Sequence, residues 1–250
     1  MGWDVIRHSL QMLFRNFRHA LRVSLGPTLI GLLAFFVIVT VLGIGLGEAM
    51  EAPNPEEMPP GVALAAILGA VLFVFISAWV AVAWHRFILL EEYPGTLPAL
   101  SGRPVWPYAG RSVQLGLLLL ALLIPAFILV AVLAAALGGS PALEALLGLG
   151  AILYFSYMSL RLGLVLPATA IGRPMGFRQS WKATEPYATA ILGTSVIIVL
   201  INGAVPQVSA LLPNPLRGLI DLAAGWVTVM LGISVLTTLY GVIIERRDLT

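Results

Sequence analysis

Long apolar stretches alternate with short charged segments along the chain, and this pattern predicts six membrane-spanning helices. A bilayer core of about 30 Å requires about 20 consecutive apolar residues in a helix. A helix is the expected conformation because it satisfies its own backbone hydrogen bonds where water is absent. The expected fold is therefore all-α, a single polytopic membrane domain with spans at residues 23–47, 61–90, 112–137, 143–170, 186–212 and 221–244.

The composition agrees with this pattern and excludes several classes of function. Of the 250 residues, 59% are hydrophobic and only 10% are charged, whereas a soluble domain carries about 25% charged residues. There is no cysteine, so disulfides and thiolate metal sites are excluded. The segments outside the spans are too short for a catalytic or nucleic-acid-binding domain. We expect no metal, no cofactor and no nucleic-acid partner.

The segment before the first span, residues 1–22, has the periodicity of an amphipathic helix. Apolar residues recur at spacings of three and four, and charged residues occupy the opposite face. Such a helix can lie at the membrane interface, where arginine attracts anionic headgroups. The helix could act as a membrane sensor or docking surface, or it could simply anchor the first span. Anchoring is the favoured interpretation. The residues expected to touch the membrane are Trp3, Arg7, Phe14, Arg15, Phe17 and Arg18.

The distribution of basic residues predicts the orientation of the chain. Arginine and lysine collect in the N-terminal segment, between the second and third spans, between the fourth and fifth, and in the tail. The opposite connections are acidic, with Arg217 their only basic residue. Because cytoplasmic loops accumulate positive charge, we expect both termini in the cytoplasm and the acidic loop at 48–60 outside.

Similar short stretches at the ends of the spans suggest a threefold repeat. The entries to the odd-numbered spans resemble one another around Gly26, Gly116 and Gly193, and the exits of the even-numbered spans do so around Arg86 and Arg161. The chain is therefore expected to form three helical hairpins in parallel orientation, each preceded by an interfacial segment.

Arg161 is the first candidate for a functional side chain because it interrupts the fourth apolar stretch. A charge at membrane depth is costly and usually faces the protein interior or water. A carboxylate partner is expected from Glu91, Glu92 or Glu245, which end other spans on the same side. Arg161 could bind an anionic substrate or lipid headgroup, or it could stabilise the helices, and the structural role is favoured.

Two neighbouring residues at the end of the second span, His85 and Arg86, are also candidates for a ligand or lipid-headgroup site. A haem would need a second histidine at similar depth, and none is present. Placement at the interface is therefore favoured over ligation for His85. Asp221 follows Arg217 by four residues, a spacing at which the two side chains pair on a helix.

Two motifs resemble a bacterial family. Arg161-Leu-Gly-Leu-Val-Leu-Pro167, followed by Gln179-Ser-Trp-Lys-Ala-Thr184, is similar to six-helix inner-membrane proteins that include the membrane portion fused to some glycerophosphodiester phosphodiesterases. This chain has Glu185-Pro186 where the family usually has glycine, and it lacks the phosphodiesterase domain. The resemblance implies a six-helix fold of the bacterial inner membrane, and the hydrolytic activity does not carry over to this chain.

These observations favour a non-enzymatic accessory or scaffold protein over an enzyme, because the sequence offers no paired nucleophile and base. Its expected partners are membrane lipids with anionic headgroups, and either a membrane protein complex or further copies of itself. The alternative is a small transporter or lipid translocator with Arg161 as its anionic-substrate site.

Overall fold

The computed structural model describes residues 1–45 and 60–249, and regular secondary structure in this part of the chain is entirely helical. Six of its helical segments are long and apolar enough to cross a membrane, as predicted. The elements are α1 (Gly2–Arg15), α2 (Phe17–Val41), α4 (Pro60–Leu90), α5 (Val105–Ala136), α6 (Pro141–Leu162), α7 (Val165–Ala170), α8 (Phe177–Ala183), the 3-10 helix η1 (Glu185–Tyr187), α9 (Ala188–Ser209) and α10 (Asn214–Ile243).

Three helices begin well before the predicted spans. The predicted starts at 23, 112 and 221 become Phe17, Val105 and Asn214. The predicted spans were bounded at charged residues. The backbone of a helix can continue past such a residue, because its long side chain can reach the membrane surface. The end of the first predicted span and nearly all of the predicted acidic loop, residues 46–59, lie outside the described residues.

The fourth predicted span, 143–170, corresponds to one candidate membrane span, Pro141–Ala170, but its helix is interrupted. Helix α6 ends at Leu162 and α7 begins at Val165. Pro167 lacks an N–H and its ring crowds the carbonyl four residues earlier, which belongs to Gly163. The Gly163 carbonyl instead accepts a bond of 3.0 Å from the Leu166 N–H. The proline therefore separates the two helices.

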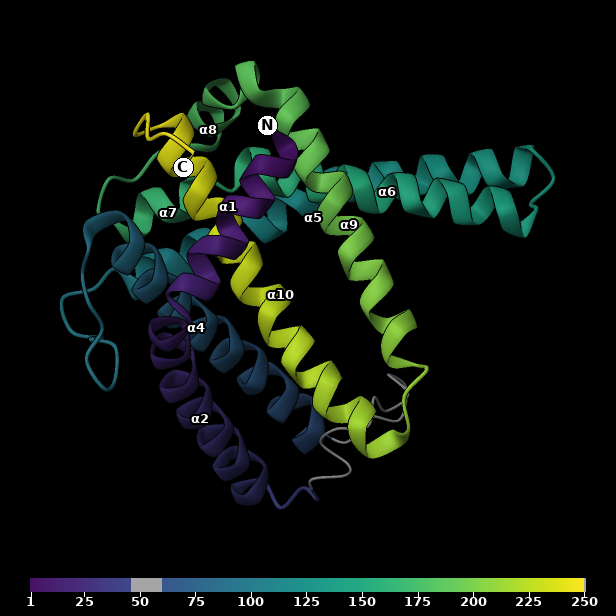
Figure 1. The fold of residues 1–250 in the computed structure, drawn as a ribbon. Helices are drawn as coiled ribbons and strands as arrows, with labels where there is room; N and C mark the ends of the chain where they lie inside the picture. Colours follow the sequence, from purple (N-terminus) through teal and green to yellow (C-terminus); the bar gives the residue numbers. More distant parts are fainter. Residues whose placement is uncertain (46–59, 250) are drawn as a thin grey trace.

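The long helices form three hairpins, α2 with α4, α5 with α6, and α9 with α10 (Figure 1). The hairpins diverge from a shared region, and the α5–α6 hairpin projects away from the other two (Figure 1). The α5–α6 turn contains Gly138 and Gly139, both with positive φ, and Ser140 caps α6 by accepting from the Leu143 N–H. The hairpins are observed, while the threefold sequence repeat stays a prediction.

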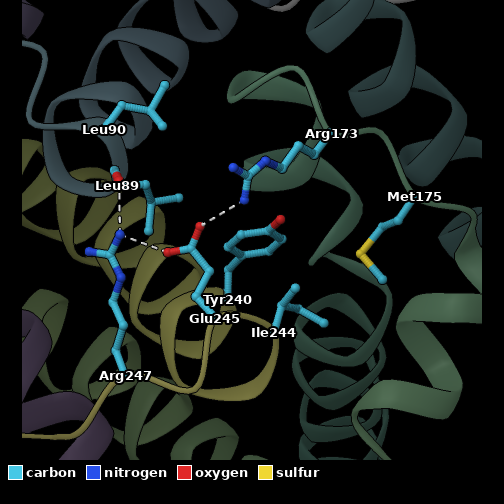
Figure 2. A pocket seen from close by; sticks show the side chains of 8 residues that line it. All are labelled: Leu89, Leu90, Arg173, Met175, Tyr240, Ile244, Glu245 and Arg247. Atoms are coloured by element: carbon cyan, nitrogen blue, oxygen red, sulfur yellow. Dashed lines mark hydrogen bonds and ion pairs between the residues drawn. The ribbon is translucent and has the colours of Figure 1, made fainter.

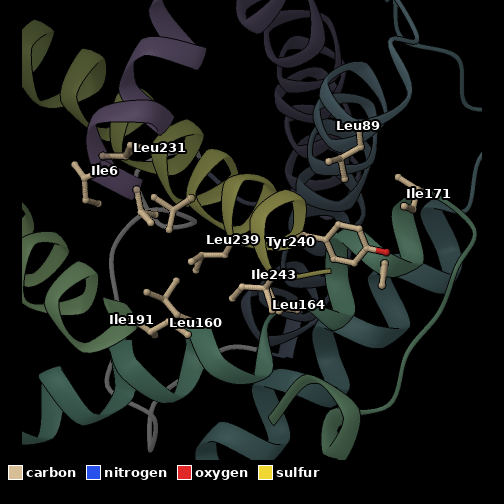
Figure 3. Close-up of a cluster of buried hydrophobic side chains, with 13 residues drawn as sticks. Ile6, Leu89, Leu160, Leu164, Ile171, Ile191, Leu231, Leu239, Tyr240 and Ile243 are labelled. Atoms are coloured by element: carbon tan, nitrogen blue, oxygen red, sulfur yellow. The ribbon is translucent and has the colours of Figure 1, made fainter. Parts of the chain in front are cut away.

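Buried side chains are concentrated where the hairpins converge. Figure 3 shows one core cluster, to which α1, α4, α6, α9 and α10 all contribute. The buried residues of α10 begin only at Met230, and its earlier half is largely exposed. The exposed ends of the hairpins are mostly aliphatic, and such surface fits contact with hydrocarbon. The chain is thus a helical protein whose six apolar helices fit an integral membrane protein.

Helix α1 lies across the bundle and packs against α9 and α10 (Figure 1). Ile6 and Leu13 of its apolar stripe are fully buried, so this part of the stripe contacts protein. Ser9 contacts the Thr238 hydroxyl at 2.9 Å. The reason is that α9 and α10 diverge and leave an apolar surface that α1 covers. The six residues expected to touch the membrane, from Trp3 to Arg18, are all exposed.

Candidate functional site

Arg161 is almost completely buried and is bound by neutral groups of the protein. Its Nε donates to the Thr184 hydroxyl at 3.1 Å, one terminal nitrogen donates to the Tyr157 hydroxyl at 3.1 Å, and the other donates to the Trp181 carbonyl at 2.9 Å. The guanidinium carbon lies 3.5 Å from the centre of the Trp181 ring. The Ser180 hydroxyl donates to the Arg161 carbonyl at 2.6 Å.

These contacts attach α8 and the residue after it to the end of α6. The prediction of a carboxylate partner was wrong, because the guanidinium contacts two hydroxyls, one carbonyl and two aromatic rings among the described residues. An arginine lying on tryptophan gains a cation–π interaction that strengthens when water is excluded. Arg161 therefore connects α6 with α8, and its guanidinium is enclosed by these protein groups.

His85 is fully buried and joins three helices. Its Nδ1 lies 2.9 Å from the Thr237 hydroxyl of α10, and its Nε2 lies 3.3 Å from the Tyr108 hydroxyl of α5. The Thr237 hydroxyl donates to the Ile233 carbonyl at 2.8 Å, so it accepts from Nδ1–H, and Nε2 accepts from Tyr108. This neutral tautomer uses both ring nitrogens. The ring therefore lies inside the protein, between α4, α5 and α10, while its placement at the depth of the membrane interface stays a prediction.

Arg86 stabilises the ends of two helices. It pairs with the Glu92 carboxylate, with one nitrogen–oxygen distance of 2.8 Å, and donates to the Ala170 carbonyl at the end of α7 at 3.0 Å. Arg103 approaches the same carboxylate at 2.6 Å. Cations near a helix C-terminus are favourable because they meet the negative end of the dipole and its free carbonyls. Arg86, His85 and Arg161 thus have separate partners and do not form one site.

A pocket that the sequence did not predict lies where α4, α10 and the segment after α7 meet (Figure 2). Its volume is about 650 Å³. The Glu245 carboxylate lies between two arginines, 2.7 Å from Arg247 and 3.9 Å from Arg173 (Figure 2). The lining residues are Leu89, Leu90, Arg173, Met175, Tyr240, Ile244, Glu245 and Arg247.

A second, larger groove of about 770 Å³ separates the α2–α4 hairpin from α10. Its lining is mostly apolar, and Asp221 is the only charged group that the described residues contribute. The lining residues are Ser24, Thr28, Gly31, Leu32 and Phe35 of α2, Ala66, Gly69, Leu72, Phe73, Ile76, Ser77 and Val80 of α4, and Asp221, Leu222, Gly225, Trp226, Val229, Met230 and Ile233 of α10.

The groove has a charged end and an uncharged interior. Asp221 pairs with Arg217 one turn earlier, as predicted, with Nε and Oδ2 3.6 Å apart and both side chains half exposed. Deeper in the groove, the Trp226 indole donates to the Ser24 hydroxyl at 2.9 Å, and this hydroxyl donates to the Ala20 carbonyl at 2.8 Å. These polar atoms are satisfied within the protein, so the wall presents mainly hydrocarbon.

Sequence analysis missed both cavities because their residues are far apart in the chain. Arg173, Glu245 and Arg247 were assigned to one side of the membrane, but only the fold places them around one space. Groups of three or more His, Asp or Glu positioned to hold a metal ion are absent from residues 1–45 and 60–249. No protein-family model, curated protein or solved structure matches the chain.

Proposed function

We propose that this protein is a non-enzymatic accessory or scaffold protein of the membrane that binds a phospholipid in the groove between the α2–α4 hairpin and α10. The observation that carries the proposal is the groove itself: about 770 Å³, lined mostly by hydrocarbon and containing one charged residue at one end. An apolar wall of this size at the depth of the spans suits an acyl chain.

The length of the groove supports this ligand. Its lining on α4 extends from Ala66 to Val80, and at about 1.5 Å per residue this corresponds to roughly 20 Å along the helix. One leaflet contributes about half of a 30 Å hydrocarbon core. The groove is therefore long enough for one acyl chain from a single leaflet.

The charged end of the groove supports a phospholipid headgroup at that position. Arg217 and Asp221 are both half exposed, and their separation of 3.6 Å is longer than a good hydrogen bond. A headgroup phosphate can therefore approach Arg217, and Asp221 can accept from an amine or hydroxyl of the same headgroup. This arrangement places the headgroup at the beginning of α10 and the chain along it.

Filling the groove tests this proposal. Gly225 lines the groove, and a Cβ built on it meets no other atom within 4 Å. We therefore expect Gly225→Phe to fold normally but to occupy the space of the acyl chain. Native mass spectrometry of protein purified in mild detergent should show one retained phospholipid in the wild type and none in this variant.

The matched control is Gly203→Phe in α9. Gly203 is also exposed and its Cβ also meets open space, but it lies outside the groove. This control should retain the phospholipid. The lipid-binding proposal would be contradicted if Gly225→Phe and Gly203→Phe retained phospholipid equally, or if the wild type retained none.

We infer that both termini face the cytoplasm of a bacterial inner membrane, supported by the arginine distribution and by the family resemblance. Because the chain has no cysteine, single cysteines are specific labelling sites. A cysteine at Ser140, in the α5–α6 turn, should react with an impermeant maleimide in intact spheroplasts, whereas one at Arg178 should react only after lysis. The reverse pattern would invert the orientation.

We also propose that the protein contacts membrane lipids and either a membrane protein complex or further copies of itself. The exposed apolar faces of the α5–α6 hairpin are compatible with lipid, with a membrane complex or with a second copy of the chain. The transporter alternative would require access to Arg161, and the contacts of this side chain with Tyr157, Trp181 and Thr184 do not favour it.

A further inference from the structure

Two arginines line the pocket shown in Figure 2, and they differ in how far the protein already uses them. Arg247 donates to the Leu89 carbonyl at 2.8 Å and also approaches the Ile88 carbonyl, so it caps the end of α4. It is further paired with Glu245 at 2.7 Å. Arg247 is thus already engaged by a helix end and by a carboxylate.

Arg173 is the arginine of this pocket with unused capacity. Its side chain is 70% exposed, and the contact with the Glu245 carboxylate is 3.9 Å long, beyond hydrogen-bonding distance. Its backbone N–H is held by the Ala168 carbonyl at 2.9 Å. The backbone therefore fixes where Arg173 emerges, while its guanidinium remains able to bind a second anion.

The Tyr240 hydroxyl is a second unused donor. The tyrosine is almost completely buried, yet its hydroxyl points toward the side of the pocket where Arg173 and Met175 lie (Figure 2). The Tyr240 hydroxyl has no hydrogen-bond partner among residues 1–45 and 60–249. A buried ring with a free O–H directed into a cavity is well placed to donate to a ligand.

We propose that this pocket binds a phosphate monoester, with Arg173 and Tyr240 donating to its oxygens. The planar guanidinium suits a phosphate because it can donate two parallel hydrogen bonds. The Glu245 carboxylate occupies the neighbouring position and competes with the ligand for Arg173. Aliphatic side chains of Leu90, Met175 and Ile244 line the same space, so the ligand carries an apolar part beside its phosphate.

This pocket is separate from the lipid groove. The groove has its charged end at Asp221, near the beginning of α10, whereas the pocket lies at the other end of the same helix. The pocket is therefore at the arginine-rich end of the protein. Its ligand could be a lipid headgroup or a soluble phosphate compound, and both share the phosphate monoester.

Calorimetric titration of the full chain in an uncharged detergent tests the proposal, with dihexanoyl phosphatidic acid and inorganic phosphate as probes. We expect Arg173→Gln to raise the Kd for phosphatidic acid about tenfold, as loss of a charge-assisted hydrogen-bond pair would. Glu245→Gln should lower this Kd several-fold because the competing charge is removed. Arg178→Gln is the matched control, since Arg178 is an exposed arginine of α8 away from the pocket, and should leave the Kd unchanged.

The outcomes separate the ligand sources and the two proposals. Binding of phosphatidic acid alone supports a lipid headgroup, and binding of both probes supports a soluble phosphate compound. Equal Kd values for Arg173→Gln and Arg178→Gln, or no binding of either probe, would overturn the site. If Glu245→Gln does not fold, the comparison of Arg173→Gln with Arg178→Gln still tests whether the pocket binds the probe. Lipid retention by Gly225→Phe is independent of these results.

Discussion

We expect the replacement of Arg161 with alanine to lower the unfolding temperature of the protein substantially. The substitution removes three hydrogen bonds from a buried cation and the stacking on Trp181. Hydrogen bonds to charged groups contribute about 1.5–3 kcal/mol each but are not additive, so we expect the free energy of unfolding to fall by about 3–5 kcal/mol. Thermal unfolding in mild detergent, followed by circular dichroism, measures this loss.

A lysine at position 161 should restore little of the stability. Lysine keeps the charge but cannot present the planar fork that reaches Thr184, Tyr157 and the Trp181 carbonyl together. Arg178→Ala is the control, because Arg178 is exposed on α8 and its removal should change the stability by less than about 0.5 kcal/mol. If Arg161→Ala melts like the wild type, its role is not structural and the substrate-site alternative gains.

Truncation of Ile6 is expected to destabilise the protein far more than truncation of Trp3 on the same helix. Ile6 is fully buried against the core that α6, α9 and α10 build (Figure 3). Ile6→Ala leaves a cavity there and should cost about 2–4 kcal/mol. Trp3 is 60% exposed, and we expect Trp3→Ala to cost less than about 1 kcal/mol in detergent.

The same pair of variants distinguishes two positions for α1. A helix lying on the membrane surface would place both side chains in the apolar layer, and both substitutions would mainly weaken attachment to lipid. A helix packed against α9 and α10 makes Ile6 part of the folded core. Equal unfolding temperatures for Ile6→Ala and Trp3→Ala in detergent would contradict the packing described here.

At the candidate site, most partners of Arg161 and His85 come from segments that the sequence could not place next to them. A buried arginine in a span was expected to need a carboxylate, but Arg161 donates to Tyr157 of its own helix, to Trp181 of α8 and to Thr184 just after α8. His85 and Arg86 were considered together as candidates for one ligand or headgroup site. The turn of the helix directs the two side chains differently, and the imidazole contacts Tyr108 and Thr237 inside the protein.

The sequence by itself determined the helical class and the six apolar helices, because the thickness of a hydrocarbon layer sets the length of an apolar stretch and the absence of water requires internal backbone hydrogen bonds. It also predicted the Arg217–Asp221 pair, since contacts four residues apart on a helix are local. Only the tertiary structure decided that one face of α1 packs against α9 and α10, that Arg161 contacts α8 and Thr184, and that Arg173 and Tyr240 face one pocket. Apolar surfaces of equal hydropathy suit lipid and protein alike, and which of the two covers a side chain depends on packing between segments distant in the chain.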